Sequence, residues 1–125
     1  MPPPEADGRR ALGRRGEEEA VRYLKGRGYQ ILARGFRKLR GEIDIIARLG
    51  ETVVFVEVRA RGRTEFGLPL ESIKRPKQNQ VRKIALAYLQ KHRLPEEQTA
   101  CRFDVLSIVW LEGRAPTITH IENAF

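Results

Sequence analysis

Two acidic residues, Asp44 and Glu57, each interrupt a run of apolar residues that is typical of a buried strand. The two runs cover residues 41–47 and 53–59. A carboxylate inside such a strand is costly to bury unless it is paired with a cation or bound to a metal ion. Asp44 and Glu57 are therefore the first candidates for a functional site, and divalent-cation binding is the chemistry that they indicate.

Residues 49–52 form a short turn sequence between the two runs, which predicts a β-hairpin. Pairing Leu49 with Thr52 would place Asp44 directly opposite Glu57 on one face, with Cβ atoms about 5 Å apart. Like charges so close repel unless something neutralises them, and Mg²⁺ suits the pair because it binds one or two carboxylates together with water and phosphate oxygens. Two structural acids satisfied by nearby arginines are the alternative. A one-residue register shift would also place the acids on opposite faces.

A third acid, Glu17, lies on the apolar stripe of a predicted helix over residues 9–25. It precedes Ala20 by three residues and Leu24 by seven, which is the spacing of one helix face. That face should pack on the sheet, so Glu17 is expected to point toward the strand acids. The alternatives are an edge position that points outward and a salt bridge to Arg14.

Arg59 is a candidate cation for the same site. It follows Glu57 by two residues, so the two side chains should point to the same face of the strand. In the register above, Arg59 lies opposite Glu42. It would provide either a cross-strand ion pair with Glu42 or a positive charge beside the metal, directed at a phosphate group.

Hydrophobic periodicity predicts the elements that hold these residues. Helices are expected over residues 9–25 and 76–92, and strands over residues 29–37, 41–47, 53–59, 102–110 and 117–121. This order predicts an α/β domain in which helices flank a central mixed five-stranded sheet. Lys74 and Lys77, near the start of the second helix, either cover the core or reach the acids. Residues 1–8 form an expected flexible leader, and residues 9–125 an expected single domain.

The charge balance favours a polyanionic partner. The chain has 24 Lys and Arg residues against 16 Asp and Glu, a net charge of +8 and a pI near 10.2. Phosphates would be attracted to this charge, with release of counterions. An acidic membrane surface is the alternative, but no basic amphipathic anchor is evident. No apolar run approaches the roughly 20 residues of a membrane span, and no signal-peptide core is present, so a cytoplasmic protein without membrane attachment is expected.

The single cysteine and the two histidines limit other chemistries. Cys101 has no second cysteine, which excludes an intrachain disulfide and a cysteine metal cluster. It is expected to be buried or half-buried, whereas His92 and His120 are expected at the surface. No glycine-rich phosphate loop is present, which argues against nucleotide hydrolysis by that device.

Motifs distributed along the chain resemble those of a known family. They are Gly16-Glu17, Gly28-Tyr29, Gly41-Glu42-Ile43-Asp44, Phe55-Val56-Glu57-Val58-Arg59, Arg61, Phe66-Gly67, Lys77 and Arg102-Phe103-Asp104. Over about Gly13 to Ile108 the chain looks like the YraN-like family of uncharacterised bacterial proteins, which is placed in the PD-(D/E)XK nuclease-like superfamily. It is also similar to archaeal Holliday-junction resolvases. There too a helix glutamate lies eleven residues before a glycine–aromatic pair, and the strand acids are thirteen residues apart.

This resemblance implies a restriction-endonuclease-like fold and a metal-dependent nuclease that acts on branched or otherwise structured DNA. Asp44, Glu57 and the carbonyl of Val58 would hold one or two Mg²⁺ or Mn²⁺ ions, and Glu17 would support the metal or the attacking water. Arg59 completes the implied catalytic group. Basic residues around the cleft would position the nucleic-acid backbone rather than read bases. These residues are Arg14, Arg40, Arg61, Arg63, Lys74 and Lys77. A homodimer would match the junction resolvases, which cut two strands as dimers.

Arg59 departs from the pattern of the superfamily, which has lysine at this position. Arginine keeps its proton and is bulkier, so it preserves phosphate binding better than activation of the attacking water. Lys74 or Lys77 could supply the missing ammonium group. The departure favours an alternative, a non-catalytic nucleic-acid-binding protein on a nuclease-derived fold. A protein-interaction scaffold without affinity for nucleic acid is a third alternative. A second difference is Gly35, at a position where the YraN-like family often has asparagine.

Overall fold

The computed structural model describes residues 8–62, 73–111 and 113–125 of the chain. Its elements are α1 (Gly8–Gly26), β1 (Gln30–Lys38), β2 (Gly41–Leu49), β3 (Thr52–Arg61), α2 (Arg75–Lys91), a short 3₁₀ helix η2 (Glu96–Gln98), β4 (Cys101–Val109) and β5 (Thr117–Ile121). The order and type of the expected helices and strands are confirmed, and η2 is an addition. The expected leader, residues 1–8, lies outside the described residues except for Gly8, at which α1 begins.

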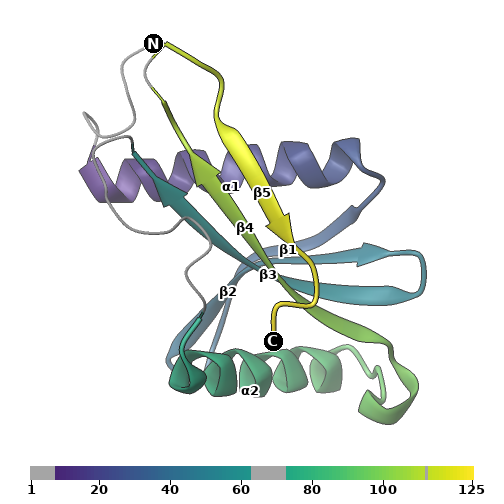
Figure 1. The fold of residues 1–125 in the computed structure, drawn as a ribbon. Helices are drawn as coiled ribbons and strands as arrows, with labels where there is room; N and C mark the ends of the chain where they lie inside the picture. The colour runs from purple at the N-terminus through teal and green to yellow at the C-terminus, as the bar shows by residue number, and fades with distance from the viewer. Residues whose placement is uncertain (1–7, 63–72, 112) are drawn as a thin grey trace.

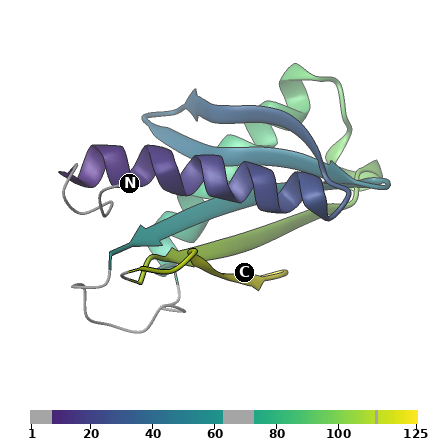
Figure 2. The same ribbon diagram turned by 90° about the horizontal axis from the view of Figure 1, so that it is seen from above.

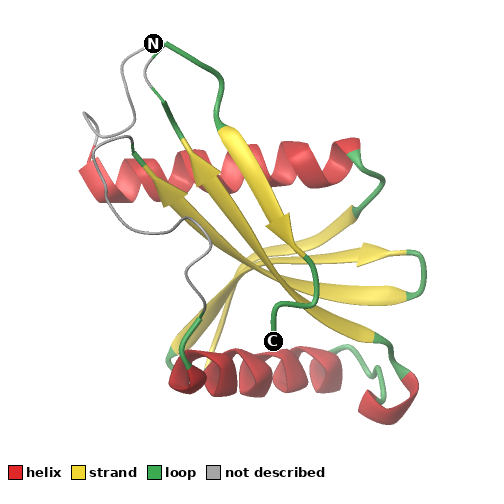
Figure 3. Cartoon of the chain, viewed as in Figure 1, coloured by secondary structure: helices red, strands yellow, loops and turns green. Residues whose placement is uncertain are grey.

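The five strands form one open, mixed sheet in the order β1-β2-β3-β4-β5 (Figures 1 and 3). β3 and β4 are parallel, and every other neighbouring pair is antiparallel. α2 connects the two parallel strands, as a parallel crossover requires. The predicted α/β class is therefore confirmed, and the architecture is consistent with a restriction-endonuclease-like fold.

The two helices cover opposite faces of the sheet. In Figure 1 α1 crosses behind the upper parts of β4 and β5 and α2 lies at the bottom, and in Figure 2 α1 is nearest the viewer. Ala20, Val21 and Leu24 of α1 pack in one buried cluster with Val54 and Val56 of β3. The second cluster lies on the α2 side and contains Ile43, Ile46, Val53, Phe55, Val81, Ile84, Ala85, Tyr88 and Leu89. Neither helix in the described part of the chain has an apolar segment long enough to cross a membrane.

The central strand β3 is covered on both faces, which explains its nearly uninterrupted apolar sequence. Val53 to Val56 are all buried, and Glu57 follows them with only 9% of its surface exposed. An acid at the end of this run is thus enclosed by protein rather than directed at solvent.

The predicted register of the hairpin is confirmed from Leu49–Thr52 to Ile45–Val56, where the pairing of β2 with β3 ends. Asp44 and Glu57 occupy the next position. There the Asp44 carboxylate accepts a hydrogen bond of 2.8 Å from the backbone N–H of Val58. β2 also bends at this point, because Ile43 packs on the α2 side while Ile45 packs on the α1 side. Residues two apart on a regular strand would share a face.

Gly35 of β1 lies beside this bend. It lies between Arg34 and Phe36, whose partners on β2 are Ile45 and Ile43, so it faces Asp44 across the ladder. Its φ is +60°, in the left-handed region that glycine and asparagine adopt more readily than other residues. The glycine of this chain and the asparagine that the resemblance implies therefore both suit this backbone.

A buried polar network attaches the C-terminal segment to β4. Asp104 is fully buried and accepts hydrogen bonds from Arg102 Nε (2.9 Å), Arg102 Nη2 (2.8 Å) and the Asn123 N–H (2.9 Å), and it lies 2.7 Å from His120 Nε2. Burial alone would raise the pKa of Asp104, but the bonds to His120 and Arg102 lower it. The expectation that His120 is a surface residue is wrong, because its side chain is only 8% exposed beside Asp104. Cys101, expected to be at least half-buried, is exposed at the start of β4.

Gly16 sets the distance between α1 and the sheet, which yields a test of the packing. A Cβ added at Gly16 would lie 2.6 Å from Cβ of Ala60 on β3, whereas one added at Gly13 of the same helix would meet nothing within 4 Å. We expect Gly16→Ala to lower the free energy of unfolding by about 1–3 kcal/mol through overpacking. Gly13→Ala should raise it by roughly 0.5–1 kcal/mol, because alanine favours the helix. Urea denaturation measures both, and equal effects of the two substitutions would contradict the packing described here.

Candidate metal centre

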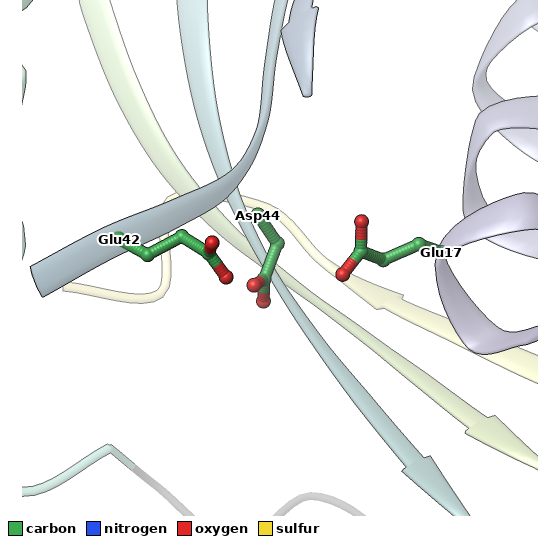
Figure 4. Close-up of side chains that lie close together, drawn as sticks. All are labelled: Glu17, Glu42 and Asp44. Carbon is green, nitrogen blue, oxygen red and sulfur yellow. The ribbon is translucent and has the colours of Figure 1, made fainter. Parts of the chain in front are cut away.

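Three carboxylates converge where α1 passes over β2. One oxygen each from Glu17, Glu42 and Asp44 lies within 4.8 Å of the others. Figure 4 shows the Glu17 side chain extending from α1 toward Asp44, while Glu42 extends from β2, the strand that also carries Asp44. The prediction from helical phase that Glu17 points toward the strand acids therefore agrees with its position.

Asp44 is held by the backbone at the end of the β2–β3 pairing. Its hydrogen bond from the Val58 N–H fixes one carboxylate oxygen. Burial raises the pKa of Asp44, and the neighbouring Glu42 raises it further, whereas the Val58 N–H and the charge of Lys77 oppose this change. The ionised carboxylate is thus positioned but incompletely compensated.

Glu57 of β3 is a fourth acid beside this group, and the four acids are called the acidic centre below. Glu57 is the most buried of the four. Its Oε2 lies 3.6 Å from Lys77 Nζ on α2. Its Oε1 is buried and accepts no hydrogen bond from any described residue. Burial first, and the charge of Asp44 second, raise the pKa of Glu57 to about 7, although Lys77 and Arg59 oppose the rise. A buried carboxylate oxygen without a partner is costly when ionised, which makes this position a candidate for cation binding.

Glu17 shows the same deficit of positive charge. Burial raises its pKa, and the charges of Asp44 and Glu42 raise it further, while Arg34 lowers it. The close approach of Gly16 to Ala60 brings this turn of the helix against the sheet. Glu17 is therefore directed toward other carboxylates, in contrast to Glu18, which pairs with Arg34 at 2.8 Å on the outer side.

The donor set fits a hard divalent cation. It consists of carboxylate oxygens, the ligands that Mg²⁺, Mn²⁺ and Ca²⁺ prefer. Bond lengths of about 2.1 Å for Mg²⁺ and about 2.5 Å for Ca²⁺ allow two ligands of one ion to lie up to roughly 4.2 or 5 Å apart. The 4.8 Å limit on the separations among Glu17, Glu42 and Asp44 is close to this range. Glu57, although outside that group of three, interacts with Asp44 through its charge.

The predicted cations take different positions around the acids. Lys77 is the lysine that reaches Glu57, and its side chain is 46% exposed. Lys74 is an exposed residue at the N-terminus of α2. The positive charge of Arg59 acts on Glu57, in agreement with their common face of β3. Glu42 pairs with Arg37 of the neighbouring strand at 3.1 Å.

The remaining predicted nucleic-acid contacts lie on separate elements. Arg14 is exposed on α1, Arg40 is exposed in the turn between β1 and β2, and Arg61 is the last residue of β3. Arg63 lies outside the described residues.

Glu42 is the member of the acidic group that the sequence-based prediction placed elsewhere. The predicted hairpin register, continued to position 42, places Glu42 opposite Arg59. The pairing of β2 with β3 ends at Ile45, before that position. A simpler signal was present, since Glu42 precedes Asp44 by two residues on the same strand and should share its face.

Comparison with known proteins agrees with the resemblance given by the motifs. The model of the Uncharacterised protein family UPF0102 matches residues 16–108, which include every acid of the centre. The chain belongs to this family. It is similar to the UPF0102 proteins of Geobacter metallireducens, with 48% identity over 93% of each chain, and of Alkaliphilus oremlandii, with 44% identity over 91% of this chain and 97% of the relative. The UPF0102 protein of Nocardia farcinica is 40% identical over 94% of this chain and 91% of its own.

The raised pKa of Glu57 predicts how stability depends on pH. Folding raises this pKa from its ordinary value of 4.5 to about 7, so the folded protein binds the proton more tightly than the unfolded chain. The stability contributed by the protonated group is fully present below pH 4.5 and is lost as pH rises through about 7. Without added metal, Glu57→Gln should therefore unfold with about 1–3 kcal/mol more free energy than the natural protein at about pH 8, and with little difference at about pH 5.

Glu51→Gln, in the exposed turn between β2 and β3, is the matched control because it removes the same charge outside the centre. Its difference from the natural protein should be small at both pH values. Chemical denaturation at the two pH values measures these differences. A Glu57→Gln variant that is equally destabilised at both pH values would show that Glu57 is ionised and well compensated in the folded protein.

Proposed function

We propose that this protein is a metal-dependent nuclease of the PD-(D/E)XK superfamily that hydrolyses phosphodiester bonds in branched or otherwise structured DNA. The observation that carries the proposal is the enclosed Glu57 oxygen that lacks a hydrogen bond, beside three converging carboxylates. A structural cluster of acids would be compensated by its neighbours, whereas a cation site is complete only when the cation is bound. Membership of UPF0102 is compatible with this activity and does not itself specify it.

Two of the acids would bind the metal ion directly, and the other two would add negative charge around it. Asp44, Glu57 and the Val58 carbonyl would hold Mg²⁺ or Mn²⁺, with Glu17 and Glu42 completing the negative surroundings. When bound, the cation supplies a water of lowered pKa and neutralises charge on the phosphate. The N–H of Val58 keeps Asp44 oriented for this role, because it fixes one of the two carboxylate oxygens.

Lys77 would supply the ammonium group that the superfamily carries at position 59. Its Nζ lies 3.6 Å from Glu57, and its side chain is half-exposed, so it can contact both the acid and an approaching phosphate. Arg59 would remain a phosphate-binding group, because its guanidinium keeps the proton and offers paired donors. The +8 net charge of the chain would add non-specific attraction for the nucleic-acid backbone.

A second candidate function, non-catalytic nucleic-acid binding on a nuclease-derived fold, is favoured by one observation. Arg59 stands where the resembled superfamily has lysine, and arginine is a poor substitute for a group that activates water. This function requires the basic surface but no turnover.

Cleavage of four-way-junction, flap and linear DNA with Mg²⁺ or Mn²⁺ tests the leading proposal. We expect the natural protein to cleave the branched substrates and Asp44→Asn to lose at least about a hundredfold in rate, because removal of a metal ligand removes the bound cation. Glu51→Gln should retain full activity. Equal rates for the natural protein and Asp44→Asn would indicate a contaminating nuclease and contradict the proposal.

The roles of Lys77 and Arg59 are tested separately. Lys77→Met should lower kcat by about tenfold or more while changing the Kd for DNA by less than roughly threefold, because the lysine acts on the reaction more than on binding. Lys91→Met, at the opposite end of α2, is the control and should match the natural protein. If Arg59→Lys cleaves DNA and the natural protein does not, the non-catalytic candidate is the correct one.

A further inference from the structure

The turn between β1 and β2 has an unfavourable backbone for its sequence. Lys38 pairs with Gly41, so Leu39 and Arg40 form a two-residue hairpin loop. Their φ angles are +52° and +60°. Positive φ at both positions is typical of a type I′ turn, in which Asn-Gly is the preferred pair. Leucine and arginine adopt this conformation reluctantly, so a requirement for backbone stability alone does not explain them.

Leu39 is the most exposed large apolar side chain in the described part of the chain. It is 57% exposed, compared with 42% for Leu111 and 36% for Leu49. Its neighbours Arg37, Lys38 and Arg40 are all exposed cations. An apolar side chain held in water among positive charges matches a partner that offers both phosphates and an apolar surface, such as stacked bases.

The turn is fixed in place rather than loosely attached. Gln80 Nε2 of α2 donates hydrogen bonds to the carbonyl oxygens of Leu39 (3.3 Å) and Arg40 (3.4 Å). A Cβ at Gly41 would lie 2.6 Å from Gln80 Nε2 and 2.8 Å from Ile84 Cδ1, so the strand approaches α2 as closely as a glycine allows. Leu39 therefore projects from a rigid support.

The turn also lies near the acidic centre. In Figure 1 it is beside the N-terminal end of α2, the helix that carries Lys77. Asp44 follows Arg40 by four residues along β2, a distance of about 13 Å at roughly 3.3 Å per residue. A nucleic acid with one phosphate bound at the acids would thus contact Leu39 a few nucleotides away from that phosphate.

We propose that Leu39 is a wedge that inserts between bases at a branch point, while Arg37, Lys38 and Arg40 hold the flanking phosphates. The proposal rests on the proposed function for the position of the reacting phosphate. Insertion requires the bases to unstack, and unstacking costs least where pairing is already interrupted. The wedge therefore favours branched DNA over linear duplex, and it identifies the branch point itself as the feature recognised.

Binding without divalent metal tests the wedge independently of cleavage. In EDTA at about 150 mM salt, the natural protein should bind a four-way junction at least about tenfold more tightly than a linear duplex of equal length. A 2-aminopurine base at the branch should increase in fluorescence on binding, because it loses its stacking partner. Leu39→Asn should weaken junction binding roughly five- to tenfold, leave duplex binding within about twofold and abolish the fluorescence change.

The melting temperature of Leu39→Asn shows whether unfolding causes the weaker junction binding. Asparagine accepts positive φ more readily than leucine, so Leu39→Asn should melt at the same temperature as the natural protein or higher. Leu49→Asn, at the end of β2 and next to the turn to β3, is the control and should bind both DNAs normally. Unchanged junction binding by Leu39→Asn, equal losses on junction and duplex, or no DNA binding by the natural protein would each overturn the wedge.

The outcomes also separate this inference from the proposed function. Leu39-dependent junction binding without cleavage would support the wedge and overturn the nuclease. Junction cleavage that Leu39→Asn leaves unchanged in rate and selectivity would support the nuclease and overturn the wedge.

Discussion

The end of pairing between β2 and β3 at Ile45–Val56 is the constraint on which the centre depends. A buried backbone N–H needs an acceptor, and beyond this point β2 no longer supplies one to Val58 from its backbone. The Asp44 carboxylate takes this hydrogen bond instead. Separation of the strands leaves room for Glu17 from α1 on one side and Lys77 from α2 on the other. The early end of the β2–β3 ladder thus leaves a site in the sheet that side chains from both helices reach.

Burying the carboxylates of the acidic centre destabilises the folded protein when they are ionised. Burial raises the pKa of Glu17, Asp44 and Glu57, so each carboxylate is less readily ionised in the folded protein. Elsewhere the chain compensates a buried acid fully, since Asp104 has Arg102, His120 and the Asn123 N–H as partners. Asp104 and Glu57 are both buried, so the difference between them lies in their partners and not in their burial. Strain or deficit that the fold could have avoided is an indication of function.

Local patterns predicted much of this arrangement. The turn at residues 49–52 gave the hairpin register, and helical phase gave the direction of Glu17, because both depend on residues close in the sequence. Glu42 was misplaced because nothing local marks where the β2–β3 ladder ends. His120 was misplaced because its partner Asp104 belongs to the neighbouring strand β4, whose register the sequence does not encode locally. The Leu39-Arg40 turn was not predicted because its sequence lacks the residues that usually mark such turns.

The central claim, that the acids form a divalent-cation site, is tested most directly by titration calorimetry with Mn²⁺. Measured at about pH 7 in two buffers of different ionisation enthalpy, binding should saturate and release protons, because Glu57, with a pKa of about 7, must lose its proton to become a ligand. Asp44→Asn should show neither the binding heat nor the proton release. Absence of binding by the natural protein at millimolar Mn²⁺, or binding that Asp44→Asn retains, would contradict the account.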